Sequence, residues 1–258
     1  MQKEETKTEK SALMEGMQSI RSVVSGNERG VNDRRIEEIL VDRKKTKTLC
    51  KELGWLRHVA ERSGFLIREC DADEIDGLAL GRSHGGILAR CSERTIPKLN
   101  AAAIKENGFY VMIEGIEDPY NFGYALRSLY AAGVDGIVLD ERNWMGAAGV
   151  VARSSAGASE MFPVFTSKPT EAADLFHDNG YSIVCADLDT PHTLDETEIR
   201  FPVFLVVGGE RRGISKALLD RADLKVRISY GREFRAALSA ASAATIFAYE
   251  IFRQNRKH

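Results

Sequence analysis

A carboxylate follows a glycine pair in the second half of the chain, where the backbone can approach a ligand. Gly208 and Gly209 come directly after the apolar run 204–207, and Glu210 is next. Because glycine permits tight turns, a ligand can lie against the amides of this loop. The acidic side chain disfavours a phosphate and suits a cationic or hydroxyl-rich ligand. A simple glycine turn with a solvated acid is the alternative interpretation.

The pattern after this glycine pair differs from two common phosphate-binding loops. Gly213 is the last glycine of the segment, and no lysine and hydroxyl residue follow it directly, as a P-loop requires. Three glycines with the spacing of a dinucleotide-binding loop are also absent. The residues that follow, 214–222, predict a short helix.

A second polar pair, Asn121 and Arg127, follows another apolar run. Residues 110–113 predict a buried strand, which an Asp-Pro step then breaks. Apolar residues recur from there at helical spacing until Gly133. We therefore expect Asn121 at or next to the helix start, accepting from free amides, with Arg127 about two turns further on, near the end of the strand. Asn121 as a simple cap and Arg127 as a solvated charge remain the alternative.

The third segment, 228–250, predicts a short strand, a polar loop and an alanine-rich helix. Small residues along 236–244 permit the close approach of either a neighbouring helix or a ligand.

In this order, the three segments resemble the motifs of the SpoU group of RNA 2′-O-ribose methyltransferases, within the SPOUT superfamily. The matching residues are Asp118, Pro119, Asn121, Gly123 and Arg127 for the first motif, D-P-x-N-x-G-x-x-x-R, and Gly208, Glu210 and Gly213 for the second, G-x-E-x-x-G. The segment Ala237-Leu238-Ser239 falls where the third motif usually reads Ser-Leu-Asn. The resemblance covers residues 109–252.

The resemblance implies an α/β fold in which a small N-terminal α/β substrate-binding domain precedes a C-terminal α/β domain with a parallel sheet and a deep trefoil knot. It also implies that S-adenosylmethionine binds among loops of the second and third motifs. The implied cofactor-binding residues are Gly208, Gly209, Glu210, Gly213, Ile228, Leu238 and Ser239. A homodimer is implied too, with the active site assembled across the interface, so that Arg127 of one subunit faces the cofactor of the other.

The third motif departs from the family pattern. Ala237 and Ser239 replace serine and asparagine, and Ala241 replaces a second serine. The loop 228–238 carries three charged residues in place of a mostly apolar stretch: Arg232, Glu233 and Arg235.

The match to the first two motifs and the changes in the third lead to two possible functions. The first is methyl transfer from S-adenosylmethionine to a ribose 2′-hydroxyl of structured rRNA or tRNA, with Asn121 and Arg127 as catalytic residues. Because an arginine stays protonated in nearly all proteins, Arg127 is expected to anchor a phosphate and stabilise charge, with Asn121 fixing its position. The alternative is a catalytically weakened or silent RNA-binding paralogue that retains the fold.

Residues before the first motif are expected to form a separate domain. Residues 1–17 are polar and predict a flexible leader, followed by an RNA substrate-binding domain over 18–100 and the methyltransferase domain over 101–258. The spacing of Ile36, Ile39 and Leu40 predicts a helix, as does that of Leu49, Leu53 and Leu56. Residues 65–67 and 86–89 predict strands.

The charged residues, cysteines and histidines do not predict a further functional site. Basic residues that could follow an RNA backbone are Arg21, Arg29, Arg34, Arg35, Arg43, Lys44, Lys45 and Lys47. Interleaved acids and a formal net charge of −2 favour a solvated helix of mixed charge over 28–47. The four cysteines lie far apart and indicate reduced thiols in a cytoplasmic protein. No metal-ligand spacing or membrane-spanning stretch is expected, and His84 is interpreted as a turn residue.

Overall fold

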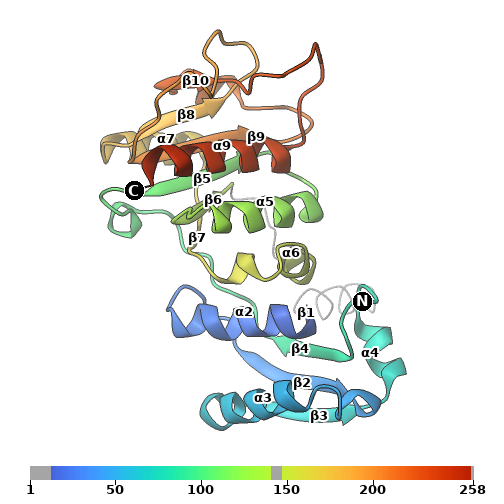
Figure 1. Ribbon diagram of the computed structural model, residues 1–258. Helices are drawn as coiled ribbons and strands as arrows, with labels where there is room; N and C mark the ends of the chain where they lie inside the picture. The colour runs from blue at the N-terminus through green and yellow to red at the C-terminus, as the bar shows by residue number, and fades with distance from the viewer. Residues whose placement is uncertain (1–12, 141–146, 257–258) are drawn as a thin grey trace, which may run out of the picture. The chain divides into compact units, whose positions relative to one another are not determined.

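The computed structural model describes residues 13–140 and 147–256, which form two compact units (Figure 1). Unit 1 contains the described residues of 1–95 and 143–161, and unit 2 those of 96–142 and 162–258. The second segment of unit 1 was not part of the expected division at residue 100.

Unit 2 is built on a six-stranded sheet in which every neighbouring pair of strands is parallel. Its order is β10-β8-β9-β5-β6-β7. The strands are β5 (Phe109–Glu114), β6 (Gly136–Leu139), β7 (Val164–Thr166), β8 (Ser182–Ala186), β9 (Val203–Gly208) and β10 (Leu224–Val226), and the helices α5 (Pro119–Ala131), α7 (Pro169–Asp178), α8 (Lys216–Leu219) and α9 (Ala240–Asn255). The predicted α/β fold with a parallel sheet is confirmed.

The apolar runs of β5 and β9 explain why these strands lie at the centre of the sheet. Residues 109–112 and 203–207 are all buried, as expected for parallel strands covered on both faces. Helices α5 and α9 pack against each other and lie side by side on one face of this sheet in Figure 1.

The chain reverses its direction across the sheet between β5 and β9. From β5 it continues outward to β6 and β7, whereas β9 is followed by β10 beyond β8, on the opposite side. Parallel strands paired in this way open a crevice outside their carboxyl ends, where α/β proteins bind ligands. Both glycine-containing motifs leave the sheet at this edge.

The start of α5 corrects the role expected for Asn121. Asp118 is the N-cap, and its Oδ1 accepts hydrogen bonds from the amides of Tyr120 at 2.7 Å and Asn121 at 3.4 Å. Pro119 occupies the first turn, where its missing N–H is not needed. The expectation that Asn121 caps the helix is wrong, and its side chain is free for another contact.

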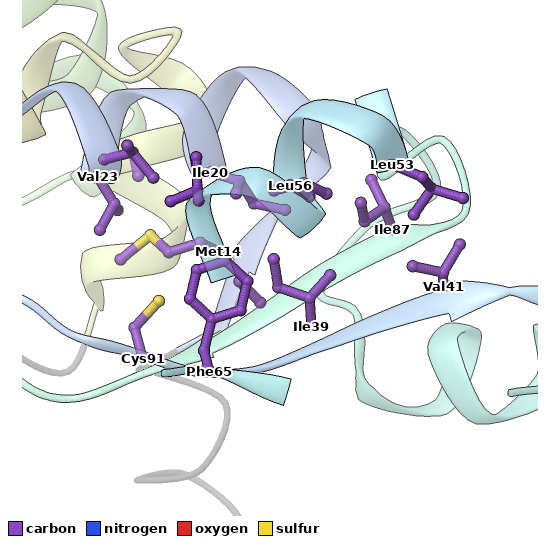
Figure 2. Close-up of a cluster of buried hydrophobic side chains, with 14 residues drawn as sticks. Met14, Ile20, Val23, Ile39, Val41, Leu53, Leu56, Phe65, Ile87 and Cys91 are labelled. Atoms are coloured by element: carbon purple, nitrogen blue, oxygen red, sulfur yellow. The ribbon is translucent and has the colours of Figure 1, made fainter. Parts of the chain in front are cut away.

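Unit 1 contains a four-stranded mixed sheet with the order β1-β4-β2-β3. Its elements are β1 (Leu13–Glu15), α2 (Gly16–Glu28), β2 (Ile36–Asp42), α3 (Cys50–Ser63), β3 (Leu66–Cys70), α4 (Ala72–Leu78), β4 (Ile87–Cys91) and α6 (Ala148–Ser154). Figure 2 shows the core in which side chains of α2 and α3 meet those of β2 and β4. Residues 13–17 therefore belong to β1 and α2 and not to a flexible leader, and residues 1–12 lie outside the described part.

The helix expected around Ile36, Ile39 and Leu40 is a strand. Residues 39–41 are all fully buried, with Ile39 and Val41 in the core of Figure 2 and Leu40 in a second cluster with Ile75 of α4. Because both faces of β2 are covered, its apolar residues do not alternate with polar ones. Their i, i+3, i+4 spacing is therefore the same as that of an amphipathic helix. The helix of mixed charge expected over 28–47 is also wrong, because α2 ends at Glu28 and residues 36–42 form β2.

A buried ion pair ties the second segment of unit 1 to the first. The carboxylate of Glu160 accepts from Arg34 Nε at 3.1 Å and from Asn32 Nδ2 at 2.5 Å, and Glu160 is only 3% exposed. Arg94 donates to the carbonyl of Ser159 at 2.7 Å, and burial lowers the pKa of Arg94. Arg34 is therefore a structural residue and not part of an exposed RNA-binding surface.

All four cysteines are unpaired, and three of them are buried. Burial raises the pKa of the Cys91 and Cys185 thiols to about 12, so both stay protonated and unreactive at neutral pH. Among the described residues, no helix combines the length and apolar character that crossing a bilayer requires.

Replacing Glu160 by alanine should destabilise unit 1 strongly. The substitution leaves the Arg34 guanidinium buried without its carboxylate, which typically costs about 3–5 kcal/mol in the free energy of unfolding. Urea unfolding followed by circular dichroism measures this loss. The control is Glu171→Ala, which removes the exposed pair with Lys168 and should cost less than about 1 kcal/mol. Equal effects of the two substitutions would contradict the structural role of Glu160.

Candidate functional site

A cavity of about 540 Å³ lies at the carboxyl ends of β8, β9 and β10. This volume is within the range of small-molecule sites. All seven residues expected to bind the cofactor line it: Gly208, Gly209, Glu210, Gly213, Ile228, Leu238 and Ser239. The structure thus brings the second and third motifs, which are separated in sequence, to one site.

Close backbone packing explains the glycines of the second motif. A Cβ at position 209 would lie 2.4 Å from the carbonyl oxygen of Gly115, and one at position 208 would lie 2.6 Å from the Cα of Gly213. Gly213 has a positive φ of 63°, a conformation that other residues rarely adopt. The loop after β9 can therefore fold against the loop after β5 only because these positions lack side chains.

Two side-chain contacts join the first and second motifs across this edge of the sheet. Asn121 Nδ2 donates to Glu210 Oε1 at 2.9 Å, and Arg211 pairs with Glu117 at 3.0 Å. Asn121 and Glu210 were expected in different roles, yet the structure places them in one hydrogen-bonded pair. The carboxylate of Glu210 fixes the orientation of the Asn121 amide at the rim of the cavity.

The third motif starts the last helix. Ser239 is the N-cap of α9, and its Oγ accepts from the amide of Ser242 at 3.2 Å. Serine is a favourable N-cap, so Ser239 stabilises the start of this helix. Ala237 also lines the cavity but offers no polar group, so this departure does remove a potential contact.

Arg127 is not among the residues that line the cavity. It lies on the exposed side of α5 and makes no ion pair with any residue that the structure describes. Tyr120 and Tyr124, which lie seven and three positions earlier, share its helical face and are also exposed. Within one chain, the structure therefore brings together every expected site residue except Arg127.

Several lining residues were not singled out from the sequence. Asp187 and Asp189 follow β8, Arg227 and Tyr230 follow β10, and Arg212 follows the glycine pair. Their place directly after apolar runs could have indicated that they line the site, because the carboxyl ends of parallel strands meet at the same edge of a sheet.

The chemistry of this lining fits S-adenosylmethionine. Carboxylates of Asp187, Asp189 and Glu210 suit its ammonium, sulfonium and ribose hydroxyl groups, whereas Arg212 and Arg227 suit its carboxylate. Apolar side chains, Ile228 and Leu238 among them, suit its adenine ring.

The remaining histidine of interest, His84, is held in a turn of unit 1. Its Nδ1 accepts from the amide of Gly86 at 3.1 Å and its Nε2 lies 3.0 Å from Asp76 Oδ1. Over residues 13–140 and 147–256, no group of three or more histidine, cysteine or carboxylate side chains is placed to hold a metal ion.

Residues 108–249 match the model of the SpoU rRNA Methylase family. A Staphylococcus saprophyticus protein assigned to the TrmH family of tRNA/rRNA methyltransferases is 26% identical over 209 residues, covering 79% of this chain and 83% of the relative. A Bacillus subtilis protein with the same assignment is 25% identical over 202 residues, covering 76% and 80%.

Solved structures give the same result for the fold. The SpoU methyltransferase AviRb from Streptomyces viridochromogenes, in complex with AdoMet, has a TM-score of 0.76 at 22% identity, covering 94% of this chain and 89% of its own. An RNA 2′-O ribose methyltransferase has a TM-score of 0.74 at 21% identity, covering 94% and 88%. At these identities the likeness concerns the fold.

Replacing Gly209 by alanine should weaken S-adenosylmethionine binding by about tenfold or more, equivalent to about 1.4 kcal/mol. The added Cβ meets the backbone of Gly115 and displaces the loop that lines the cavity. Isothermal titration calorimetry measures the affinity. The matched control is Gly231→Ala, because a Cβ at Gly231 would enter open space. Unchanged affinity in the Gly209 variant would refute the close-packing argument.

Proposed function

The chain belongs to the SpoU rRNA methylase family of RNA methyltransferases, and from this we propose that it transfers a methyl group from S-adenosylmethionine to a ribose 2′-hydroxyl of structured rRNA or tRNA. The observation that carries the proposal is the convergence of all seven expected cofactor residues on one cavity, with the Asn121–Glu210 pair at its rim.

The cavity residues have distinct roles in this proposal. The cofactor, when bound, supplies an activated methyl group. The glycine loop offers backbone amides, and the acidic side chains offer acceptors for hydroxyl and ammonium groups. Glu210 has a second role, because it holds the Asn121 amide at 2.9 Å. Asn121 is thereby oriented to help position the attacking hydroxyl, which is the main requirement of an in-line displacement.

We further propose that the active site is completed by a second copy of the chain. Five of the large apolar side chains exposed in the described residues lie on the packed helices α5 and α9: Tyr120, Tyr124, Ile246, Tyr249 and Phe252. Tyr124 is 52% exposed and Tyr249 is 60% exposed. A face of this kind suits an interface between copies.

Arg127 shares this face, so dimerisation through α5 and α9 brings its guanidinium toward the partner and away from its own cavity. In this arrangement Arg127 anchors a phosphate of the RNA and stabilises negative charge near the reacting hydroxyl. The trefoil knot implied by the family is part of the same proposal, as the path by which α9 closes the cavity.

RNA contact by unit 1 completes the proposal. A second cavity, of about 740 Å³, lies in this unit, and its lining mixes the cations Lys45 and Arg82 with the carboxylates Asp42 and Asp76. Lys44 is next to Lys45, and these lysines can contact RNA phosphates. The reduced cysteines are consistent with a cytoplasmic enzyme.

One observation favours the alternative of a silent RNA-binding protein. Ala237 lines the cavity where the family usually has a serine, so one polar contact is missing. Calorimetry with S-adenosylmethionine separates the two functions, because a silent protein that has lost its cofactor site gives no binding at millimolar concentration.

Glu210→Ala should weaken S-adenosylmethionine binding by about tenfold or more and abolish most methyl transfer, because it removes a cavity carboxylate and releases Asn121. Calorimetry and transfer of tritiated methyl to total rRNA and tRNA measure the two effects. Arg211→Ala is the matched control, since Arg211 is on the same loop but pairs outward with Glu117. Equal losses in both variants would contradict the role of Glu210.

Mixing inactive variants tests the shared active site. Arg127→Ala and Glu210→Ala subunits should each lack activity alone, whereas refolding them together should restore about a quarter of the wild-type activity, because half of the dimers are mixed and each mixed dimer has one intact site. Tritiated methyl transfer measures the recovery. No recovery, with co-purification of differently tagged subunits showing that mixed dimers formed, would place Arg127 in its own subunit's site.

A further inference from the structure

The loop between β10 and α9 presents an aromatic side chain to solvent beside the cofactor cavity. Residues 231–237 are all exposed, and Phe234 is 58% exposed. Its ring centroid lies 5.9 Å from that of Tyr230, and the two planes are tilted by 59°. Because Tyr230 lines the cavity, this contact holds Phe234 next to the cavity wall.

The two ends of this loop are anchored although its middle is exposed. Ser229 Oγ donates to Asp195 Oδ1 at 2.6 Å, and this hydrogen bond lowers the pKa of Asp195. Ser239 caps α9 at the other end. The loop is thus held at both ends, and the contact with Tyr230 keeps Phe234 beside the cavity.

Two guanidinium groups lie on either side of Phe234 in sequence. Among the described residues Arg235 pairs with Glu233 alone, at 3.3 Å, and both side chains are almost fully solvated, so water and salt screen this pair. Arg232 makes no ion pair with a residue that the structure describes. Both arginines can therefore bind a phosphate without breaking a strong ion pair.

We propose that Phe234 stacks on an unpaired base of the RNA substrate, next to the nucleotide that enters the cavity, while Arg232 and Arg235 contact the adjoining phosphates. An exposed aromatic ring between cations is the recurring arrangement for single-stranded RNA, because every base has a face on which a ring can stack. Bases inside a duplex offer no such face. The substrate class is therefore RNA whose target lies in a loop, bulge or unpaired end, and this inference rests on the proposed function.

The test measures binding of a fluorescein-labelled oligoadenylate of about twelve nucleotides, and of a duplex of equal length, by fluorescence anisotropy. The wild-type protein should prefer the single strand. Phe234→Ala should weaken its binding by about 5- to 100-fold, the range expected for one lost stacking contact. Phe234→Trp should retain the affinity, whereas Phe234→Leu, which is apolar but cannot stack, should resemble the alanine variant.

The arginines are tested by the salt dependence of the same binding. Arg232→Gln and Arg235→Gln should each reduce the slope of log affinity against log salt by about 0.7, the value for one phosphate contact on a single strand. Lys216→Gln, a substitution of an exposed cation outside the loop, is the control and should leave the slope unchanged.

Two further measurements keep this proposal separate from the proposed function. Calorimetry with S-adenosylmethionine should give the same affinity for Phe234→Ala and wild type, and light scattering should give the same oligomeric state. An oligomeric state that changes in Phe234→Ala would show that the loop contacts a second copy, and would overturn the inference. Equal RNA affinity of wild type and Phe234→Ala, or no binding of the single strand by the wild type, would also overturn it. If the wild type did not bind S-adenosylmethionine, the proposed function would be refuted, but the proposal for Phe234 would not.

Discussion

The parallel pairing of β5 with β9 is the constraint on which the site depends. Glu114 lies opposite Gly208 in this pair, and the amide of Gly209 donates to the carbonyl of Glu114 at 2.7 Å. The two loops that leave these strands are therefore in backbone contact, and no side chain fits between Gly209 and Gly115. This contact brings the first and second motifs together, and with them Asn121 and Glu210.

The two units solve the problem of burial in different ways. In unit 2 the central strands are apolar throughout, and the polar residues are confined to the edge where these strands end, so the core and the site do not compete. Unit 1 instead buries a charged pair, Arg34 with Glu160, to hold a segment that is distant in sequence. Such a pair contributes little net stability. Removing one partner nevertheless lowers the free energy of unfolding strongly, because the other partner is left as an unpaired buried charge.

The exposed side chains of unit 2 complete this picture. Aromatic residues on α5 and α9, and Phe234 in the loop before α9, remain in water in the single chain. Their surroundings differ: the helical aromatics lie near Arg127 on α5 and near Arg253 on α9, which is paired with Glu250, whereas Phe234 is flanked by two arginines and touches Tyr230 at the cavity. This difference is why a second copy suits the first surface and an unpaired base suits the second.

The sequence by itself determined the motif order, the two central strands of unit 2 and the glycine positions, because continuous apolar runs and glycine turns are local properties. The short strand expected within 228–250 is wrong in place, because β10 ends at Val226. The sequence also failed at residues 36–42, where burial on both faces imitated helical spacing, and at Asn121, where Asp118 competed for the cap. Only the tertiary structure decided that Asn121 meets Glu210, that Arg34 is buried, and that Asp187 and Tyr230 join the cavity. These contacts join residues far apart in the chain, and the pairing of strands in the sheet, which no local pattern encodes, brings them together.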